Sequence, residues 1–390
     1  MKYIMCIVEL FYRLISRLLQ VLGLLNVIII EMEQCTRENT LAVLKEILRR
    51  GWDKRYRIVL VSHEPERISH WKSKRVAVIR KYKYGDKRHT MWPVRWYSLQ
   101  ACLIIDENIQ IKKRSPLTKR VYLSHGSPVK DTHEYYNCGP DTDYALCQSE
   151  FWKPIESYGL NIAEDKFVIK GLPRNDALFE SGISLNEFFD SAFAKIVVWY
   201  PTFRQREDRY CIQNTESAAI PIIHDEAAAR HINEIAAKYG VMLVVKPHPV
   251  QDISRIQNLN LDHLKVITDE FFARHGITSY EFLGKTDALI TDYSSVVFDY
   301  LLTGKPIALA QEDYEEYEKK VGFAIDMNLL RYCGVQLETA EDFEPFFREL
   351  VEGNDPLREK RDELMHLTNQ YTDGHSTERV VDWLETLLKN

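Results

Sequence analysis

The chain has 390 residues, of which 45% are hydrophobic and 28% are charged, so it is long enough for two folded domains with separate cores. Its formal net charge of −6 argues against general affinity for nucleic acid, and we expect no nucleic-acid partner. The seven cysteines include no Cys-x-x-Cys pair, which is typical of reduced thiols and not of a disulfide framework or a zinc site.

Residues 1–26 predict a helix with two unlike faces. Helical spacing places polar side chains on one face, namely Glu9, Arg13, Ser16, Arg17 and Gln20. The opposite face carries Ile4, Ile7, Val8, Phe11, Leu14, Ile15, Leu18, Leu22 and Leu25. A membrane-spanning helix tolerates such a polar stripe poorly, so we expect an amphipathic helix that lies in the membrane interface. The alternative is a helix that packs on the protein's own core.

From residue 27 onward, short apolar runs alternate with helical stretches. Predicted strands lie at residues 27–30, 57–61, 76–79, 103–105, 121–123, 144–147 and 167–169. Predicted helices lie at residues 40–50 and 149–158. Because strands that alternate with helices favour a parallel, doubly wound sheet, we expect residues 27–175 to form a Rossmann-like domain.

The alternation restarts after residues 176–194, which are a candidate hinge. Predicted strands lie at residues 196–200, 241–245, 265–267, 288–290 and 307–309, with a helix near 225–239. The expected fold class is therefore α/β, with two Rossmann-like domains facing a cleft, the second at residues 195–370. Residues 371–390 are expected to form a C-terminal helix after a turn at Asp373-Gly374.

Polar loops follow three of the strands predicted in the second half. They are Pro201-Thr202-Phe203-Arg204, Lys246-Pro247-His248-Pro249 and Thr291-Asp292-Tyr293-Ser294-Ser295. Ligands of an open parallel sheet bind at the carboxyl ends of its strands, so these loops are expected to share one rim. Arg204, Lys246 and His248 suit an anion there, because arginine can hold phosphate oxygens in a fork and lysine adds a point charge. The alternative for each loop alone is an ordinary polar surface.

The third loop leads into a helix predicted at residues 296–302. Ser294 and Ser295 stand at its beginning, and Gly304 suits its end. The N-terminus of a helix favours anions through its unsatisfied N–H groups and its dipole. Ser294 and Ser295 are therefore candidate phosphate-binding residues, with simple helix capping as the alternative.

In the first half, His125 and Gly126 follow the strand predicted at residues 121–123. His125 is a candidate general base near neutral pH, and Gly126 would let the backbone approach a ligand closely. The alternative is a turn with a structural histidine. A further loop, with Arg174 and Asn175, closes this half and is a candidate for the cleft.

These loops resemble, in their order along the chain, the CDP-glycerol glycerophosphotransferases of bacterial teichoic-acid and capsule assembly. The resemblance rests on His125-Gly126-Ser127-Pro128-Val129-Lys130, Tyr200-Pro201-Thr202-Phe203-Arg204, Lys246-Pro247-His248-Pro249 and Asp292-Tyr293-Ser294-Ser295 through Phe298-Asp299-Tyr300. Ser149-Glu150-Phe151, residues 171–176 and Asp373-Gly374 also occur in matching order, so the match covers about residues 115–385. The family usually has tryptophan before the histidine and threonine after the glycine, where this chain has Ser124 and Ser127.

The resemblance implies a glycosyltransferase-B-type fold in a peripheral protein on the cytoplasmic face of the membrane, with no metal or other cofactor. It implies transfer of glycerol phosphate, or a related polyol phosphate, from CDP-glycerol with release of CMP. The acceptor would be a hydroxyl of a lipid-linked saccharide or of a teichoic-acid or capsule polymer.

The resemblance also implies roles for single residues. His125 would take the acceptor's proton, and the donor phosphates would be held by His248, Arg204, Lys246, Ser294 and Ser295. Asp299 would reach the ribose unless it faces solvent, and Asp292 would orient a histidine, contact donor hydroxyls or only cap the helix. The remaining candidates to line the cleft are Gly126, Ser127, Lys130, Arg174 and Asn175.

Two other functions stay open at this point. A CMP-sugar-dependent glycosyltransferase of the same fold would need a similar base and phosphate site, but it would break a sugar carbon–oxygen bond. A non-catalytic nucleotide-binding member of a membrane assembly complex would need neither histidine, whereas His125 and His248 are both present.

Overall fold

The structure is a computed structural model of the chain. It describes residues 2–32, 38–81, 92–107, 111–131, 133, 141–180, 182–189, 191–204, 220–248, 251, 256, 259 and 261–389, with the backbone alone for residues 2–9 and 92. Contacts divide the chain into unit 1 (Met1–His125, Tyr136–Asp176 and Asp373–Asn390) and unit 2 (Gly126–Tyr135 and Ala177–Thr372). Among the described helices, none has the length and apolar character needed to cross a membrane.

Unit 1 is built on a parallel sheet. Its described strands are β1 (Val27–Glu31), β2 (Arg57–Ser62), β3 (Val76–Arg80), β4 (Ala101–Asp106), β5 (Lys119–Tyr122), β6 (Tyr144–Cys147) and β7 (Phe167–Ile169). Their order in the sheet is β3-β2-β1-β4-β5-β6-β7, and all neighbours pair in parallel. The order reverses between β1 and β4, which makes that point of the carboxyl edge the expected place for a ligand.

Helices cover both faces of this sheet. The helices of unit 1 are α1 (Lys2–Val21), α2 (Glu38–Arg49), α3 (Trp92–Gln100), α4 (Trp152–Leu160) and α13 (Ser376–Lys389), with 3-10 helices at Trp52–Lys54, Ser69–Trp71 and Glu164–Lys166. Side chains of a strand point alternately to opposite faces. Ile28 and Ile30 of β1 accordingly join the core under α2 and α13, whereas Val27 and Ile29 join the core that contains Val94 of α3.

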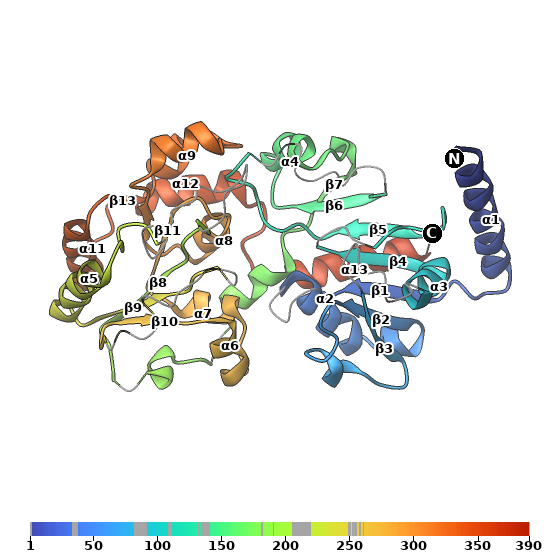
Figure 1. Cartoon of the computed structure of the whole chain (residues 1–390), viewed down its shortest axis with the longest axis horizontal. Helices are drawn as coiled ribbons and strands as arrows, with labels where there is room; N and C mark the ends of the chain where they lie inside the picture. Colours follow the sequence, from blue (N-terminus) through green and yellow to red (C-terminus); the bar gives the residue numbers. More distant parts are fainter. Residues whose placement is uncertain are drawn as a thin grey trace. The chain divides into compact units, whose positions relative to one another are not determined.

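The last helix, α13, belongs to unit 1. It lies beside α2 and is drawn in red in Figure 1. Its N-terminus is capped by Asp176, whose carboxylate accepts hydrogen bonds from the backbone N–H groups of Ser376 at 2.8 Å and Thr377 at 2.7 Å. The segment expected as a separate C-terminal helix is therefore part of the first domain's core. Asp176 is the last residue of unit 1 before the chain passes into the long segment of unit 2, and it lies within a 3-10 helix that spans Pro173–Phe179.

The first helix, α1, contacts α3 and turns part of its apolar side outward. Ser16 and Leu19 are buried, and the Ser16 hydroxyl forms a hydrogen bond with the hydroxyl of Ser115. Large apolar side chains of the described turns are exposed, namely Leu10, Phe11, Leu14, Leu18 and Val21. A polar residue of the predicted polar face thus contacts the protein, while part of the predicted apolar face does not.

Unit 2 is built on a second parallel sheet. Its described strands are β8 (Lys195–Trp199), β9 (Val241–Val245), β10 (Leu264–Val266), β11 (Ala288–Thr291), β12 (Ile307–Ala310) and β13 (Val335–Leu337). Their order is β10-β9-β8-β11-β12-β13, which is the order of a dinucleotide-binding Rossmann sheet. The order reverses between β8 and β11, so the loops after these two strands flank the expected ligand position.

The helices of unit 2 surround this sheet. They are α5 (Glu226–Lys238), α6 (Asp269–His275), α7 (Ser279–Lys285), α8 (Val296–Tyr300), α9 (Tyr314–Lys320), α10 (Asn328–Arg331), α11 (Phe343–Glu352) and α12 (Arg358–Thr368), with 3-10 helices at Leu185–Phe188, Leu301–Thr303 and Ala340–Asp342. One core cluster joins Val197 and Trp199 of β8 to Ile232 of α5 and Phe343 of α11. Asp225 caps α5 by accepting a hydrogen bond from the Ala228 N–H at 2.8 Å.

A short segment that follows His125 belongs to unit 2 and not to unit 1. Lys130 pairs with Phe323 in an antiparallel bridge. On either side of it, the Ala324 N–H donates to the Val129 carbonyl at 2.9 Å, and the Asp131 N–H donates to the Gly322 carbonyl at 3.1 Å. The expected first domain at residues 27–175 is thus interrupted, because these backbone bonds hold the segment against unit 2.

The expected α/β fold with two parallel sheets is confirmed. Each predicted strand is present, with ends displaced by at most two residues. The strand β13 was not predicted, because three residues with one polar member give no usable periodicity. The cleft between the domains stays a prediction.

Candidate active site

The loops after β8, β11 and β12 in unit 2 are joined by a buried ionic group, which we call the Arg204 cluster: Arg204, Asp292 and Asp313. Arg204 Nη1 donates to Asp292 Oδ2 at 2.6 Å, while its Nε and Nη2 donate to the two carboxylate oxygens of Asp313 at 2.7 and 3.3 Å. Arg204 is only 2% exposed and Asp292 is fully buried. The sequence predicted Arg204 and Asp292 for one rim, and the structure brings them together.

Neighbouring groups complete the hydrogen bonding of Asp292. The Thr202 N–H and hydroxyl donate to it at 3.0 and 2.5 Å, and the Tyr293 N–H donates at 2.6 Å. Buried carboxylates are stable only when paired and hydrogen-bonded in this way. Asp292 therefore fixes the loop after β8 relative to the loop after β11, which is more than capping α8.

The charges of the cluster shift the pKa values of its members. Burial alone would lower the pKa of the Arg204 guanidinium, but Asp292 and Asp313 outweigh burial and raise that pKa. Burial and the Asp313 carboxylate raise the pKa of Tyr293, whose hydroxyl stays protonated and donates to Asp313 at 2.9 Å. One guanidinium facing two carboxylates leaves the cluster with a formal charge of −1. The expected direct contact of Arg204 with phosphate stays a prediction, since Asp313 occupies the guanidinium fork.

Aromatic rings enclose this cluster. Tyr293 stacks on Tyr317 with ring centroids 3.9 Å apart, and the Arg204 guanidinium lies 5.5 Å from the Tyr293 centroid. Phe323 stacks with Tyr317 at 6.0 Å. Because rings and burial keep water away, the ion pairs are stronger here than at a surface.

Lys246 and His248 follow β9. Lys246 Nζ pairs with Asp269 Oδ1 at 2.9 Å, and the lysine side chain is 14% exposed. His248 is exposed, and its ring centroid lies 5.4 Å from that of Phe203. His248 thus presents its imidazole to solvent beside the loop that carries Arg204. Pro249, the last residue of this motif, lies outside the described residues.

Ser294 and Ser295 stand before α8, as expected. Within the described residues, the Ser295 hydroxyl makes no capping bond to the helix. The helix continues as the 3-10 helix Leu301–Thr303 and ends at Gly304. Asp299 is fully buried and accepts a hydrogen bond from the Tyr280 hydroxyl at 2.5 Å, so it does not face solvent. Its contact with a ribose stays a prediction.

His125, in unit 1, lies in a loop with unusual backbone angles. Ser124 has φ 68° and Gly126 has φ 113°, so both flanking residues adopt the left-handed region that side chains disfavour. The Asn39 amide donates to the Ser124 carbonyl at 3.1 Å, and Arg174 Nη1 donates to the His125 carbonyl at 2.8 Å. These hydrogen bonds hold the backbone at Ser124 and His125 in place, and with it the position from which the His125 side chain extends.

The other predicted residues fall into two groups. Arg174 lies beside His125, and its backbone N–H donates to the side-chain amide oxygen of Asn39 at 2.9 Å, while Asn175 is 3% exposed. Gly126, Ser127 and Lys130 are assigned to unit 2, where Ser127 is 1% exposed and Lys130 forms the bridge to Phe323. His125 and His248 therefore stand in different units.

Two residues with structural importance were missed from the sequence. Asn39 lies near the start of α2, directly downstream of β1, and Asp313 lies downstream of β12. The rule that loops after parallel strands form the site would have included both. Neither stands in a recognisable motif, so only the strand boundaries could have drawn attention to them.

The geometry can support acid–base chemistry and anion binding. Half-buried His125 offers a base mounted on a fixed backbone, and exposed His248 stands at the carboxyl edge of unit 2's sheet. Among the described residues, no group of three or more histidine, cysteine, aspartate or glutamate side chains is placed to hold a metal ion.

Comparison with known protein families gives one match that covers most of the chain. Residues 42–386 match the model of the CDP-glycerol:poly(glycerophosphate) glycerophosphotransferase family.

Individual relatives are more distant. The teichoic acid glycerol-phosphate primase of Bacillus subtilis (strain 168) is 26% identical over 63% of this chain and 58% of its own length. The teichoic acid ribitol-phosphate primase of Bacillus spizizenii is 25% identical over 68% of this chain and 66% of its own length. The aligned part of the chain thus spans less than two thirds of either relative. The solved wall teichoic acid polymerase TagF has the same fold, with a TM-score of 0.70 and 15% identity over 94% of this chain and 90% of that one.

Proposed function

The chain belongs to the CDP-glycerol:poly(glycerophosphate) glycerophosphotransferase family, and from this premise we propose that it transfers a polyol phosphate from a CDP-linked polyol to an acceptor hydroxyl. The observation that supports this most is the position of the two motif histidines. His125 follows β5 in unit 1 and His248 follows β9 in unit 2, each at the carboxyl edge of a parallel sheet. A base and a cationic group are what this transfer requires.

In the proposed reaction, the acceptor's hydroxyl oxygen bonds to the β-phosphorus of the donor. The bond between that phosphorus and the bridging oxygen breaks, CMP leaves with the electron pair, and His125 takes the hydroxyl proton. CMP is a good leaving group, so the protein has to supply a base, orientation and positive charge.

We assign the donor diphosphate to His248, Lys246 and the backbone N–H groups before α8, beside Ser294 and Ser295. Arg204 acts here as a positioning residue, because its cluster joins the loops after β8, β11 and β12. Asp292 takes part through its ion pair with Arg204. Asp299, which accepts a hydrogen bond from Tyr280, is proposed to contact the ribose of the donor.

Glycerol phosphate is the first choice of transferred group. The named relatives are a glycerol-phosphate primase and a ribitol-phosphate primase, so the proposal extends to both polyols. The proposed acceptor is a hydroxyl of a lipid-linked saccharide or of a teichoic-acid or capsule polymer.

The membrane surface is the proposed place of action, on the cytoplasmic face. Exposed Phe11, Leu14 and Leu18 of α1 suit a helix that lies in the bilayer interface. Leu14→Glu with Leu18→Glu should release the protein from anionic vesicles in a sedimentation assay, whereas Gln20→Glu, at an exposed polar position of α1, should not. If the unmodified chain, the double variant and the Gln20→Glu control bind vesicles equally, α1 is not the part of the chain that binds the membrane.

The reaction is tested by CMP release from the purified full chain. CDP-glycerol, CDP-ribitol and a CMP-sugar are compared, with membrane extract as the source of acceptor. We expect release from a CDP-polyol only, together with a new phosphodiester in the product. Release only from the CMP-sugar, with a glycosidic product, would overturn the proposal.

The histidine roles are separated by kinetics. His125→Ala should lower kcat by about 10²- to 10⁴-fold, as expected for loss of a general base. His248→Ala should mainly raise the KM for the CDP-polyol. His231→Ala, at an exposed histidine of α5, is the matched control and should change neither constant. Full activity of His125→Ala would favour a non-catalytic role.

A further inference from the structure

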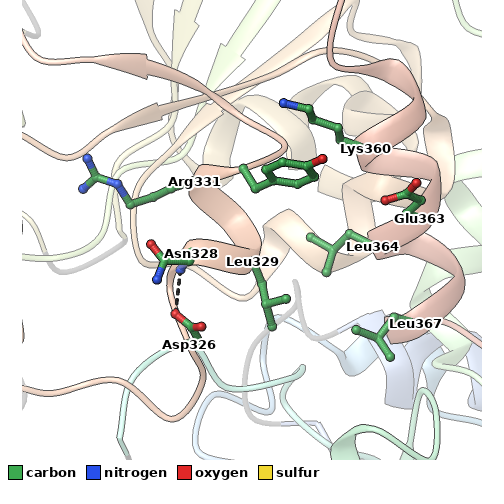
Figure 2. Close-up of a pocket in the computed structure, with 9 residues that line it drawn as sticks. Asp326, Asn328, Leu329, Arg331, Lys360, Glu363, Leu364 and Leu367 are labelled. Atoms are coloured by element: carbon green, nitrogen blue, oxygen red, sulfur yellow. Dashed lines mark hydrogen bonds between the residues drawn. The ribbon is translucent and has the colours of Figure 1, made fainter.

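A pocket of about 580 Å³ lies between α10 and α12 of unit 2 (Figure 2). Four of its residues lie on one face of α12, because Lys360, Glu363, Leu364 and Leu367 follow helical spacing. Its volume falls within the range of about 300 to 1,000 Å³ that is usual for small-molecule sites. The proposed transfer reaction uses none of the residues that line it.

One side of the pocket is apolar. Figure 2 shows Leu329, Leu364 and Leu367 grouped together. Leu367 is 43% exposed and Tyr332, which also lines the pocket, is 58% exposed. A ligand that covers large apolar side chains of this exposure removes them from water, which makes binding more favourable.

The other side of the pocket carries two cations. Lys360 Nζ lies 4.0 Å from the ring centroid of Tyr332, and the Arg331 guanidinium lies 4.6 Å from that of Tyr314. Both cationic side chains are half-buried, and within the described residues neither forms an ion pair with a carboxylate. An aromatic ring compensates only part of the solvation that a half-buried cation loses, so an incoming anion is favoured there.

Two carboxylates also line the pocket, and they differ from the cations in exposure. Asp326 and Glu363 are both exposed, and Asp326 accepts a hydrogen bond from the Asn328 N–H at 2.9 Å. Water solvates an exposed carboxylate well and salt screens it. The half-buried cations therefore decide the sign of the charge that the pocket favours.

We propose that this pocket binds a lipid phosphate, meaning a phosphate group that carries a long apolar chain. The chain lies over Leu329, Leu364 and Leu367, and the phosphate lies near Arg331 and Lys360. Separation of the apolar and cationic sides matches the separation of tail and head in such a molecule. The proposal concerns binding alone and does not rest on the transfer reaction.

The test is calorimetric titration of the full chain with decyl phosphate below its micellar concentration, without a CDP-linked donor. The double variant Arg331→Gln with Lys360→Gln should weaken binding by about tenfold or more, and Leu367→Gln by about tenfold. Two substitutions on α11, outside the pocket, are the matched controls: Arg348→Gln for loss of charge and Val351→Gln for loss of an exposed apolar side chain. Both controls should bind as the unmodified chain does.

Titrations with other ligands and variants distinguish a lipid phosphate from other possible occupants of the pocket. Inorganic phosphate that binds as tightly as decyl phosphate would reduce the pocket to a plain anion site and overturn the proposal. If decyl maltoside, which has the alkyl chain but no phosphate, binds as tightly as decyl phosphate, the cations do not contribute to binding and the proposal is overturned. Unchanged binding in the pocket variants, but loss in Leu14→Glu with Leu18→Glu, would place the probe on α1. A dimer that Leu367→Gln dissociates, without any decyl phosphate binding, would assign the pocket to a second copy of the chain.

Discussion

The Arg204 cluster and the His125 loop hold their functional residues in place by different physical means. The cluster joins three loops through the ion pairs of buried Arg204 with buried Asp292 and with half-buried Asp313. The loop relies on side-chain hydrogen bonds to backbone carbonyls and on two residues with positive φ. Removing one partner of a buried charge pair strongly destabilises the folded protein, because the other charge stays buried without a counter-charge. A hydrogen-bonded loop can shift without unfolding its domain. We therefore expect the cluster to control stability and the loop to control turnover.

Removing the guanidinium should have the largest effect. Arg204→Met leaves the buried Asp292 carboxylate without its cation, so the free energy of unfolding of unit 2 should fall by about 3–5 kcal/mol. Asp313→Asn keeps an oxygen acceptor at a site that is 18% exposed, so its loss should be smaller, about 1–3 kcal/mol. Urea denaturation measures both, and similar small losses would contradict the contrast.

A substitution beside the base should separate turnover from stability. Gly126→Ala forces a side chain onto φ 113°, which costs about 1–3 kcal/mol or displaces the loop. We expect kcat to fall while the KM for the CDP-polyol stays constant. Gly182→Ala is the matched control, because Gly182 has φ 109° and the added Cβ would meet no neighbouring atom. Equal loss of kcat in both variants would show a general effect of strain.

Asn39 offers a finer test of the loop. Asn39→Ala removes the donor to the Ser124 carbonyl and the acceptor of the Arg174 N–H, so we expect a loss of about 1–2 kcal/mol in stability and a lower kcat. Asn39→Asp keeps the acceptor and removes only the donor. If Asn39→Asp retains full kcat, the bond to Ser124 does not position His125.

The smallest effect is expected at an exposed ion pair. The Arg379 guanidinium lowers the pKa of Asp373 to about 2 from its ordinary 3.8. Since the folded state has the lower pKa, the pair stabilises unit 1 above pH 3.8, and this contribution is lost as the pH falls toward about 2. Asp373 is half-exposed, so the contribution is at most about 1 kcal/mol. Asp373→Asn should flatten that part of the acid denaturation profile.

Periodicity sufficed for the strands but not for the partners of the site residues. Apolar runs such as β6 and β9 were located to the residue, because buried strands carry a local signal. Asn39 contacts Ser124, 85 residues away, and Arg204 contacts Asp292, 88 residues away. Pairs so distant in the chain leave no trace in hydrophobic patterning. The motif order predicted which loops matter, and only the fold shows that Arg204 is enclosed by carboxylates.

The position of α13 has a consequence for synthesis of the chain. One face of unit 1's sheet is covered by a helix whose N-terminal cap, Asp176, precedes Ser376 by 200 residues. At about 5–20 residues per second, the ribosome needs roughly 10–40 seconds to make the intervening chain. Ile28, Ile30 and their neighbours stay incompletely covered for that time, while unit 2 is made nearly whole. The unit that carries His125 is therefore begun first and completed last, and a nascent chain is most exposed to chaperones and proteases on that face.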